Sequence, residues 1–186
     1  MNSNDFFTNL LKDIKTDLKD EFDKNFERKA FFNEPWAVTK MGNNRGSLMM
    51  RSGDLRKSIG ASIDYSGGTI HFTSSLPYAS IHNQGGVIIV TAKMKKYFWA
   101  MYYKASGAVS TKANGAASNS KRNKMLSGEA EFWKAMALKK VGDKLTITKR
   151  QFIGNHQNVQ NIVKQDIDNA VQAMGKQLQI QMIKNK

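Results

Sequence analysis

Cysteine is absent from the 186 residues of this chain, and proline occurs only twice. The lack of cysteine excludes disulfide frameworks, cysteine-ligated zinc and thiol nucleophiles, and it is compatible with a reducing cytoplasm. The first 20 residues also lack a long apolar run, because charged residues interrupt their apolar positions. The sequence therefore predicts neither a signal peptide nor a membrane-spanning helix. A hydrophobic content of 40% still suffices for the core of one ordinary domain.

Motifs that carry catalytic chemistry are equally scarce. The three histidines, His71, His82 and His156, do not have the spacing of a metal site. Neither a G-x-S-x-G nucleophile elbow nor a glycine-rich phosphate loop occurs in the chain. We therefore expect no enzyme, no metal site and no cofactor, and we expect each histidine to be a surface or turn residue.

Acidic residues are few, and the basic excess is concentrated in one segment. Of the formal net charge of +14, residues 93–150 contribute +11, from 14 basic and three acidic side chains. Lysines and aromatic residues occur together in KMKKYFWAMYYK, a composition that suits contact with nucleic acid. The same aromatics would also pack a helix against its neighbour while the lysines stay solvated, and both interpretations remain open. The candidate residues for contact with DNA or an acidic partner are Lys93, Lys95, Lys96, Lys121, Arg122 and Lys124.

Hydrophobic periodicity predicts a long amphipathic helix near each end of the chain. Apolar residues recur every three or four positions between Asn4 and Ala30, and again between Val159 and Met182, interrupted only by Gly175. The first stripe can pack on the chain's own sheet or on a neighbouring copy. We favour packing within the chain, because most amphipathic helices pack in this way.

Short strands are predicted between these helices. Residues 58–65 and 69–73 flank the pair Gly67-Gly68 and predict a β-hairpin, while residues 87–91 are expected to pair with 145–148. The second pairing brackets a basic insertion over 93–144, with a helix on either side of a flexible loop at about 106–128. The predicted fold is α+β, a single domain over 1–186 with a small antiparallel sheet between two long terminal helices.

Three stretches, taken in order, resemble a known family. They are SGDLRKSI at 52–59, YASIHNQGG at 78–86 and ITKRQFIG at 147–154. Their order and spacing are similar to those of the phage virion morphogenesis family, the tail completion or neck proteins of Mu-like tailed phages and prophages. The resemblance spans about residues 5–180. It implies structural or interface roles for the residues that match the motifs, which are Gly53, Leu55, Tyr78, Ala79, His82, Gly85, Arg150, Phe152 and Gly154.

The resemblance also implies a function. Members of the family act in tail completion and head–tail joining, so the expected role is a non-catalytic virion assembly protein in a ring, of six copies in related neck proteins. Its expected partners are other neck or tail proteins, without membrane contact, and its expected location is the head–tail junction, reached from the host cytoplasm. Relatives tend to have prolines where this chain has Thr148 and Gln151, and its basic insertion is longer. A DNA-associating phage or mobile-element factor that uses residues 93–150 is the alternative.

Overall fold

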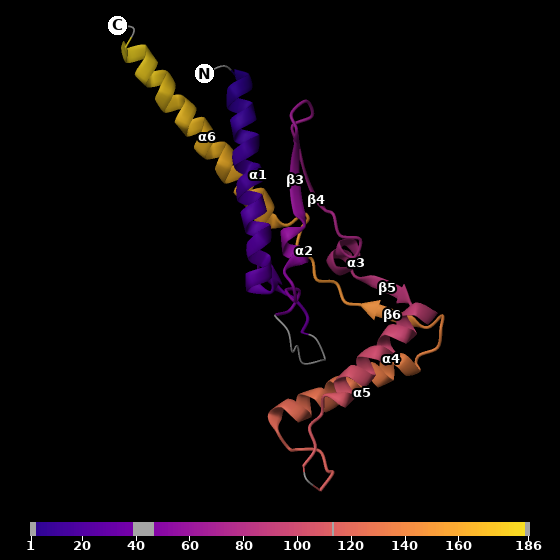
Figure 1. The fold of residues 1–186 in the computed structure, drawn as a ribbon. Coiled ribbons are helices and arrows are strands. Elements are labelled where there is room, and N and C mark those ends of the chain that lie inside the picture. Colours follow the sequence, from indigo (N-terminus) through magenta and orange to yellow (C-terminus); the bar gives the residue numbers. More distant parts are fainter. Residues whose placement is uncertain (1–2, 39–46, 113, 185–186) are drawn as a thin grey trace. The chain divides into compact units, whose positions relative to one another are not determined.

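The computed structural model describes residues 3–38, 47–112 and 114–184, and Figure 1 draws its elements. The chain divides into two units. The first unit comprises Met1–Trp36, Ser52–Ala79 and Arg150–Lys186, and the second comprises Ala37–Arg51 and Ser80–Lys149. The predicted single domain of residues 1–186 thus contains two units, and the predicted insertion over 93–144 lies wholly inside the second.

The first unit is built around the long N-terminal helix. Its apolar stripe, with Ile14, Leu18 and Phe22 buried, forms one core with Phe31 and Phe32 from the hairpin that follows. Residues of β4 and of the start of α6 pack against the same core. The expected packing of the first stripe within the chain is confirmed. The elements of the first unit are α1 (Ser3–Arg28), β1 (Ala30–Phe31), β2 (Glu34–Pro35), α2 (Asp54–Lys57), β3 (Ile59–Asp64), β4 (Thr69–Ser74) and α6 (Gln157–Lys184).

The second unit contains a helical hairpin that extends from a pair of strands. Its elements are α3 (Ala79–Gln84, whose first residue belongs to the first unit), β5 (Gly86–Ile89), α4 (Ala92–Gly107), α5 (Lys121–Leu138) and β6 (Lys144–Ile147). Figure 1 shows α4 and α5 side by side within this unit. The side chain of Thr91 accepts a hydrogen bond from the Met94 N–H and so begins α4, and Ser120 does the same for α5 through Asn123 N–H.

The α+β class is confirmed, and its strands form three separate antiparallel pairs in the described part of the chain. Residues Ile59–Asp64 pair with Thr69–Ser74 across the turn at Gly67-Gly68, as the sequence predicts. The pairing of β5 with β6 is confirmed as well, with Val87 opposite Thr146 and Ile88 opposite Leu145. One pair is not predicted, because the two-residue strands β1 and β2 are too short to show a period.

The prediction of a flexible loop over about 106–128 is wrong at both ends, where the structure has helix. Helix α4 continues to Gly107, and residues 121–128 form the first turns of α5. The side chain of Asn123, buried at the start of α5, donates to the carbonyls of Ser110 and Ser118 at 2.7 and 2.9 Å. Residues 121–128 lack aromatics, and their helix is stabilised by packing on α4 and by the Asn123 side chain. The sequence alone therefore does not reveal this helix.

A buried asparagine connects three segments of the first unit. The Asn25 side chain accepts a hydrogen bond from the Phe32 N–H at 2.9 Å and donates one to the Phe152 carbonyl at 3.2 Å. Asn25 is fully buried, so water cannot replace either bond. The same region is held by Trp36, whose indole N–H donates to the Gln151 carbonyl at 2.6 Å. Residues 25, 32 and 152 are therefore fixed relative to one another.

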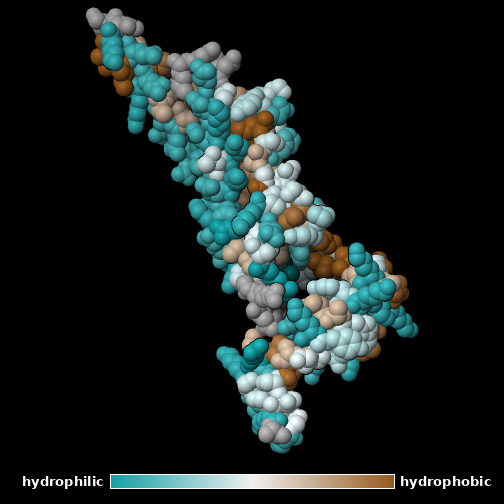
Figure 2. All heavy atoms as spheres, in the orientation of Figure 1, coloured by the Kyte–Doolittle hydropathy of each residue, from teal (hydrophilic) through white to brown (hydrophobic). Residues whose placement is uncertain are grey.

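Helix α6 packs on the rest of the first unit only over its first half. Val159, Ile162 and Val163 contact the core, whereas every residue from Val171 to Lys184 is exposed. Figure 2 shows hydrophobic atoms on this free end of α6. Gly175 does not interrupt the helix. Among the helices in the described part of the chain, none combines the length and apolar content that crossing a membrane requires.

We predict that Asn25→Leu lowers the free energy of unfolding by about 2–4 kcal/mol, because two buried backbone groups lose their partners. Chemical denaturation followed by circular dichroism measures the change. Asn169→Leu, at an exposed position on α6, is the matched control and should change stability by less than about 0.5 kcal/mol. Equal stability of Asn25→Leu and wild type would show that the asparagine does not stabilise this junction.

We also predict a dependence of stability on pH that comes from Asp166. Partial burial, together with the nearby carboxylates of Asp17 and Asp13, raises the pKa of Asp166 from 3.8 to about 6. The folded state thus holds a proton that the unfolded chain releases near pH 4. The stability gained from this proton is complete below pH 4 and is lost as the pH rises through about 6.

The variant Asp166→Asn should therefore be more stable than wild type at pH 7, by roughly 1 kcal/mol after solvent screening. The difference should shrink toward pH 4. Thermal unfolding of both proteins between pH 4 and 8 measures it, with Asp168→Asn, an exposed position on the same helix, as the control. A constant difference across this range would exclude titration of Asp166 as the cause.

Candidate functional site

The first motif, SGDLRKSI, forms the short helix α2 beside α1. Gly53 precedes the helix in the left-handed conformation, with φ of 81°, and Leu55 is buried. Arg56 forms ion pairs with Asp23 and Glu27, both on α1. The resemblance does not single out Arg56, and its acidic partners lie about 30 residues earlier, so the sequence could not show this connection.

The third motif, ITKRQFIG, crosses from the second unit to the first. Phe152 is fully buried, and its ring lies 5.4 Å from that of Phe26 on α1. Gly154 has a φ of 137°, and Arg150 is half-buried. Phe152 and Leu55 thus anchor two motifs in the first unit.

The second motif, YASIHNQGG, lies in α3 and at the start of β5. Ala79 is buried, His82 is half-buried and Tyr78 is exposed. Gly85 has a φ of 72°, and a Cβ atom there would lie only 2.9 Å from the Lys149 backbone nitrogen. Glycine is therefore required where the chain passes β6. The structure brings Gly85 beside the start of the third motif, and the nine motif residues are divided between the two units.

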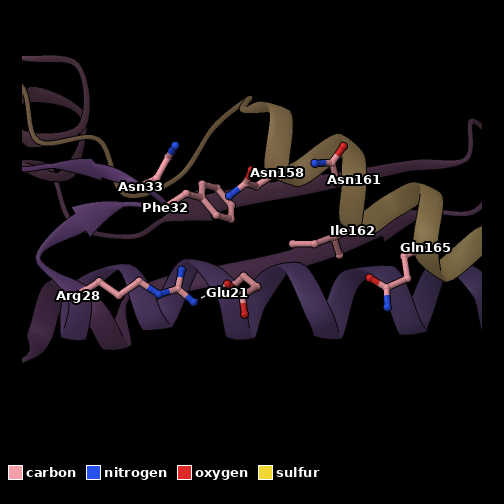
Figure 3. Close-up of a pocket in the computed structure, with 8 residues that line it drawn as sticks. All are labelled: Glu21, Arg28, Phe32, Asn33, Asn158, Asn161, Ile162 and Gln165. Carbon is pink, nitrogen blue, oxygen red and sulfur yellow. Dashed lines mark hydrogen bonds and ion pairs between the residues drawn. The ribbon is translucent and has the colours of Figure 1, made fainter.

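A shallow pocket of about 430 Å³ lies on the first unit, between α1, the β1–β2 turn and the start of α6 (Figure 3). Glu21 pairs there with Arg28 at 2.6 Å and with Lys24 at 2.7 Å. Partial burial opposes ionisation of Glu21, but the hydrogen bonds from Lys24 and Arg28 hold its pKa below the ordinary value. The pocket is lined by Glu21, Arg28, Phe32, Asn33, Asn158, Asn161, Ile162 and Gln165.

This pocket offers amides and a paired carboxylate, but it lacks a nucleophile with an adjacent base among its lining residues. Among the described residues, no group of three His, Asp or Glu side chains is arranged to hold a metal ion. The histidines are dispersed as well. His71 is exposed on β4, and His156 accepts a hydrogen bond from the Asn158 N–H at the start of α6 while its ring stacks on Phe32.

The helical hairpin of the second unit divides its aromatic residues between packing and solvent. Phe98 is buried and stacks on Trp133 of α5 at 5.9 Å, which holds the two helices together. Tyr97 and Tyr103 are 54% and 65% exposed. Both interpretations of KMKKYFWAMYYK therefore describe part of the helix, because one face packs and the opposite face meets solvent.

The exposed face of α4 carries lysines. Lys93, Lys96 and Lys104 are exposed and lie three and eight positions apart, spacings that return to the same side of a helix. Tyr97 and Tyr103 flank them, and we call these five residues the lysine ridge. Of the candidate contact residues, Lys93 and Lys96 belong to the ridge, and Lys95 is half-buried. Lys121, Arg122 and Lys124 are exposed in the first turn of α5, and sequence analysis missed Lys104.

We predict that Gly85→Ala lowers the free energy of unfolding by about 2–4 kcal/mol, because it combines a left-handed backbone with a clash against β6. Amide hydrogen exchange in β5 should accelerate together with the loss of thermal stability. The control is Gly128→Ala in α5, where a Cβ atom meets open space and the helix gains up to about 1 kcal/mol. Unchanged exchange in Gly85→Ala would contradict the requirement for glycine.

No protein-family model matches the chain, and no curated protein or solved structure matches it.

Proposed function

We propose that the chain is a structural assembly protein of a tailed phage or prophage. It acts in tail completion and head–tail joining, as a homo-oligomeric ring together with other neck or tail proteins at the head–tail junction. The ordered resemblance of the three motifs supports this role. The matching residues include buried anchors, Leu55 and Phe152, and a turn glycine, Gly85, which are structural roles and not catalytic ones.

The observation that carries the proposal is the free half of α6. Ile167, Val171, Met174, Leu178 and Met182 follow one another at steps of four, three, four and four residues and form one apolar stripe. Val171 and Leu178 are 51% and 52% exposed. A helix that presents such a stripe to water gains free energy by packing against another helix, about 25 cal/mol per Å² of apolar surface.

A second copy of this chain suits the stripe. Spacings of three and four residues are those by which helices interlock along a shared seam. Only Asp168, Lys176 and Lys184 are charged between Ile167 and Lys184, so two such helices meet with little repulsion. The stripe also lies on the first unit alone, which leaves the second unit available for other contacts in the assembled ring.

The test is genetic and structural. Disruption of the gene in the phage or prophage that carries it should yield separate heads and unjoined or overlong tails in electron micrographs of lysates. Wild-type protein supplied in trans should restore joined particles. A variant with Val171→Glu and Leu178→Glu should fail to restore them, and the purified variant should no longer form rings at concentrations where wild type does.

The matched control carries Gln172→Glu and Gln179→Glu, which add the same charge to the same turns of α6 but lie beside the stripe. This control should form rings and restore infectivity. Normal joined particles after gene disruption would overturn the assembly role. Joined particles from the stripe variant would instead show that α6 is not the contact between copies.

A further inference from the structure

The second unit carries an excess of positive charge that its own acidic side chains do not balance. Residues 80–149 contain 13 basic and three acidic side chains. The ion pairs of lysine and arginine seen in the first unit use Glu21, Asp23 and Glu27 as acidic partners, and none of them involves a lysine of the ridge. The lysine ridge therefore faces solvent without a compensating carboxylate among the described residues.

The placement of these charges also works against the helices that carry them. Three of the first five residues of α4 and three of the first four residues of α5 are basic, and neither helix has an acidic residue in its first turn. The start of a helix is its positive end, so a cation there destabilises the helix when it is not neutralised. A bound anion removes this repulsion, which makes the surface more stable when it is occupied than when it is free.

The kind of basic residue distinguishes between two classes of anionic partner. Twelve of the 13 basic residues over 80–149 are lysine, and Arg122 is the thirteenth. Protein interfaces are enriched in arginine and depleted of lysine. Lysine is a flexible point charge that accepts a phosphate in many positions, and it lacks the planar fork that reads guanine or grips a carboxylate at two points.

We propose that the lysine ridge of α4 binds the phosphate backbone of double-stranded DNA without reading its sequence. From Lys93 to Lys104 the helix rises by about 16 Å. That length spans about five phosphates of one strand in a duplex. Ala100 is exposed between Lys96 and Lys104, and its small side chain allows the DNA backbone to approach the helix there.

The exposed tyrosines favour a duplex over a single strand. The ring of Tyr103 stacks on Trp99 at 5.9 Å, and the ring of Tyr97 meets Trp133 edge-on at 5.7 Å. These contacts within the hairpin occupy ring surface that a stacking platform for unpaired bases would need. Tyr97 and Tyr103 are more than half exposed and carry hydroxyl groups, which are hydrogen-bond donors suited to phosphate oxygens.

The experiment measures binding of the full-length protein to a fluorescent 30-base-pair duplex of random sequence, by anisotropy across a series of salt concentrations. Wild type should bind with an affinity that falls steeply with salt and does not change with the sequence of the duplex. The ridge variant, with Lys93, Lys96 and Lys104 all changed to Gln, should bind about tenfold more weakly at low salt. The slope of log affinity against log salt concentration should be less negative by about 2.7, because three phosphate contacts are lost.

Two controls distinguish the effect of the ridge lysines on binding from the effect of the protein's total charge. A variant with Lys12, Lys19 and Lys164 changed to Gln loses the same charge from exposed positions of the first unit and should bind as wild type does. Changing the three ridge lysines to Arg preserves the charge and should preserve the salt dependence. If the triple Gln variant does not fold, each single Lys→Gln change should still lower the slope by about 0.9.

Equal weakening by the ridge variant and by the first-unit control would overturn the proposal. In a competition experiment, polyglutamate and unlabelled duplex are added at the same concentration of negative charge. If polyglutamate displaces the labelled duplex as well as unlabelled duplex does, the proposal is overturned and the ridge is assigned to an acidic protein surface. Tighter binding of single-stranded DNA than of duplex would contradict the duplex assignment. The proposal rests on the second unit alone, so it stands or fails independently of the assembly role and of the stripe on α6.

Discussion

The amide of Asn25 is the interaction on which the first unit depends. It joins α1, the β1–β2 turn and the segment after β6 through two hydrogen bonds in a fully buried place. Packing of aromatic rings is not directional in the way a hydrogen bond is, whereas the amide donates one bond and accepts one here, so it selects one register. Because Phe152 is held by its carbonyl, the chain that returns from the second unit enters α6 at a fixed point.

The sequence predicts the elements better than it predicts their connections. The terminal helices, the β3–β4 hairpin and the pairing of β5 with β6 each follow from a period or a turn signal, and they agree with the structure. Asn25 gives only a weak signal, a polar residue beside Phe22 and Phe26 on the apolar side of the helix. The pairing of Arg56 with Asp23 gives none, because ion pairs between elements depend on tertiary placement.

The basic insertion shows where periodicity fails. The sequence predicts helix in α4 because its aromatics recur at helical spacing. It does not predict helix over 121–128, where Asn123 and three basic residues interrupt the apolar stripe and packing supplies the stabilisation. The same limit applies to the candidate contact residues. Charge counting finds Lys93, Lys95 and Lys96 together, and only the structure separates exposed lysines from the half-buried Lys95 and adds Lys104 to their face.

The division of charge between the units follows from what each unit must stabilise. The first unit holds 13 basic and 12 acidic residues, and Arg56 and Arg28 pair with carboxylates that hold α1 to α2 and flank the pocket. In the second unit, stacked aromatics hold the helical hairpin together. The ridge lysines therefore do not stabilise the fold of this unit. The hairpin remains folded because aromatic packing stabilises it by more than the repulsion between its lysines destabilises it. A surface stabilised in this way gains most from a partner that supplies many negative charges at once, as a phosphate backbone does.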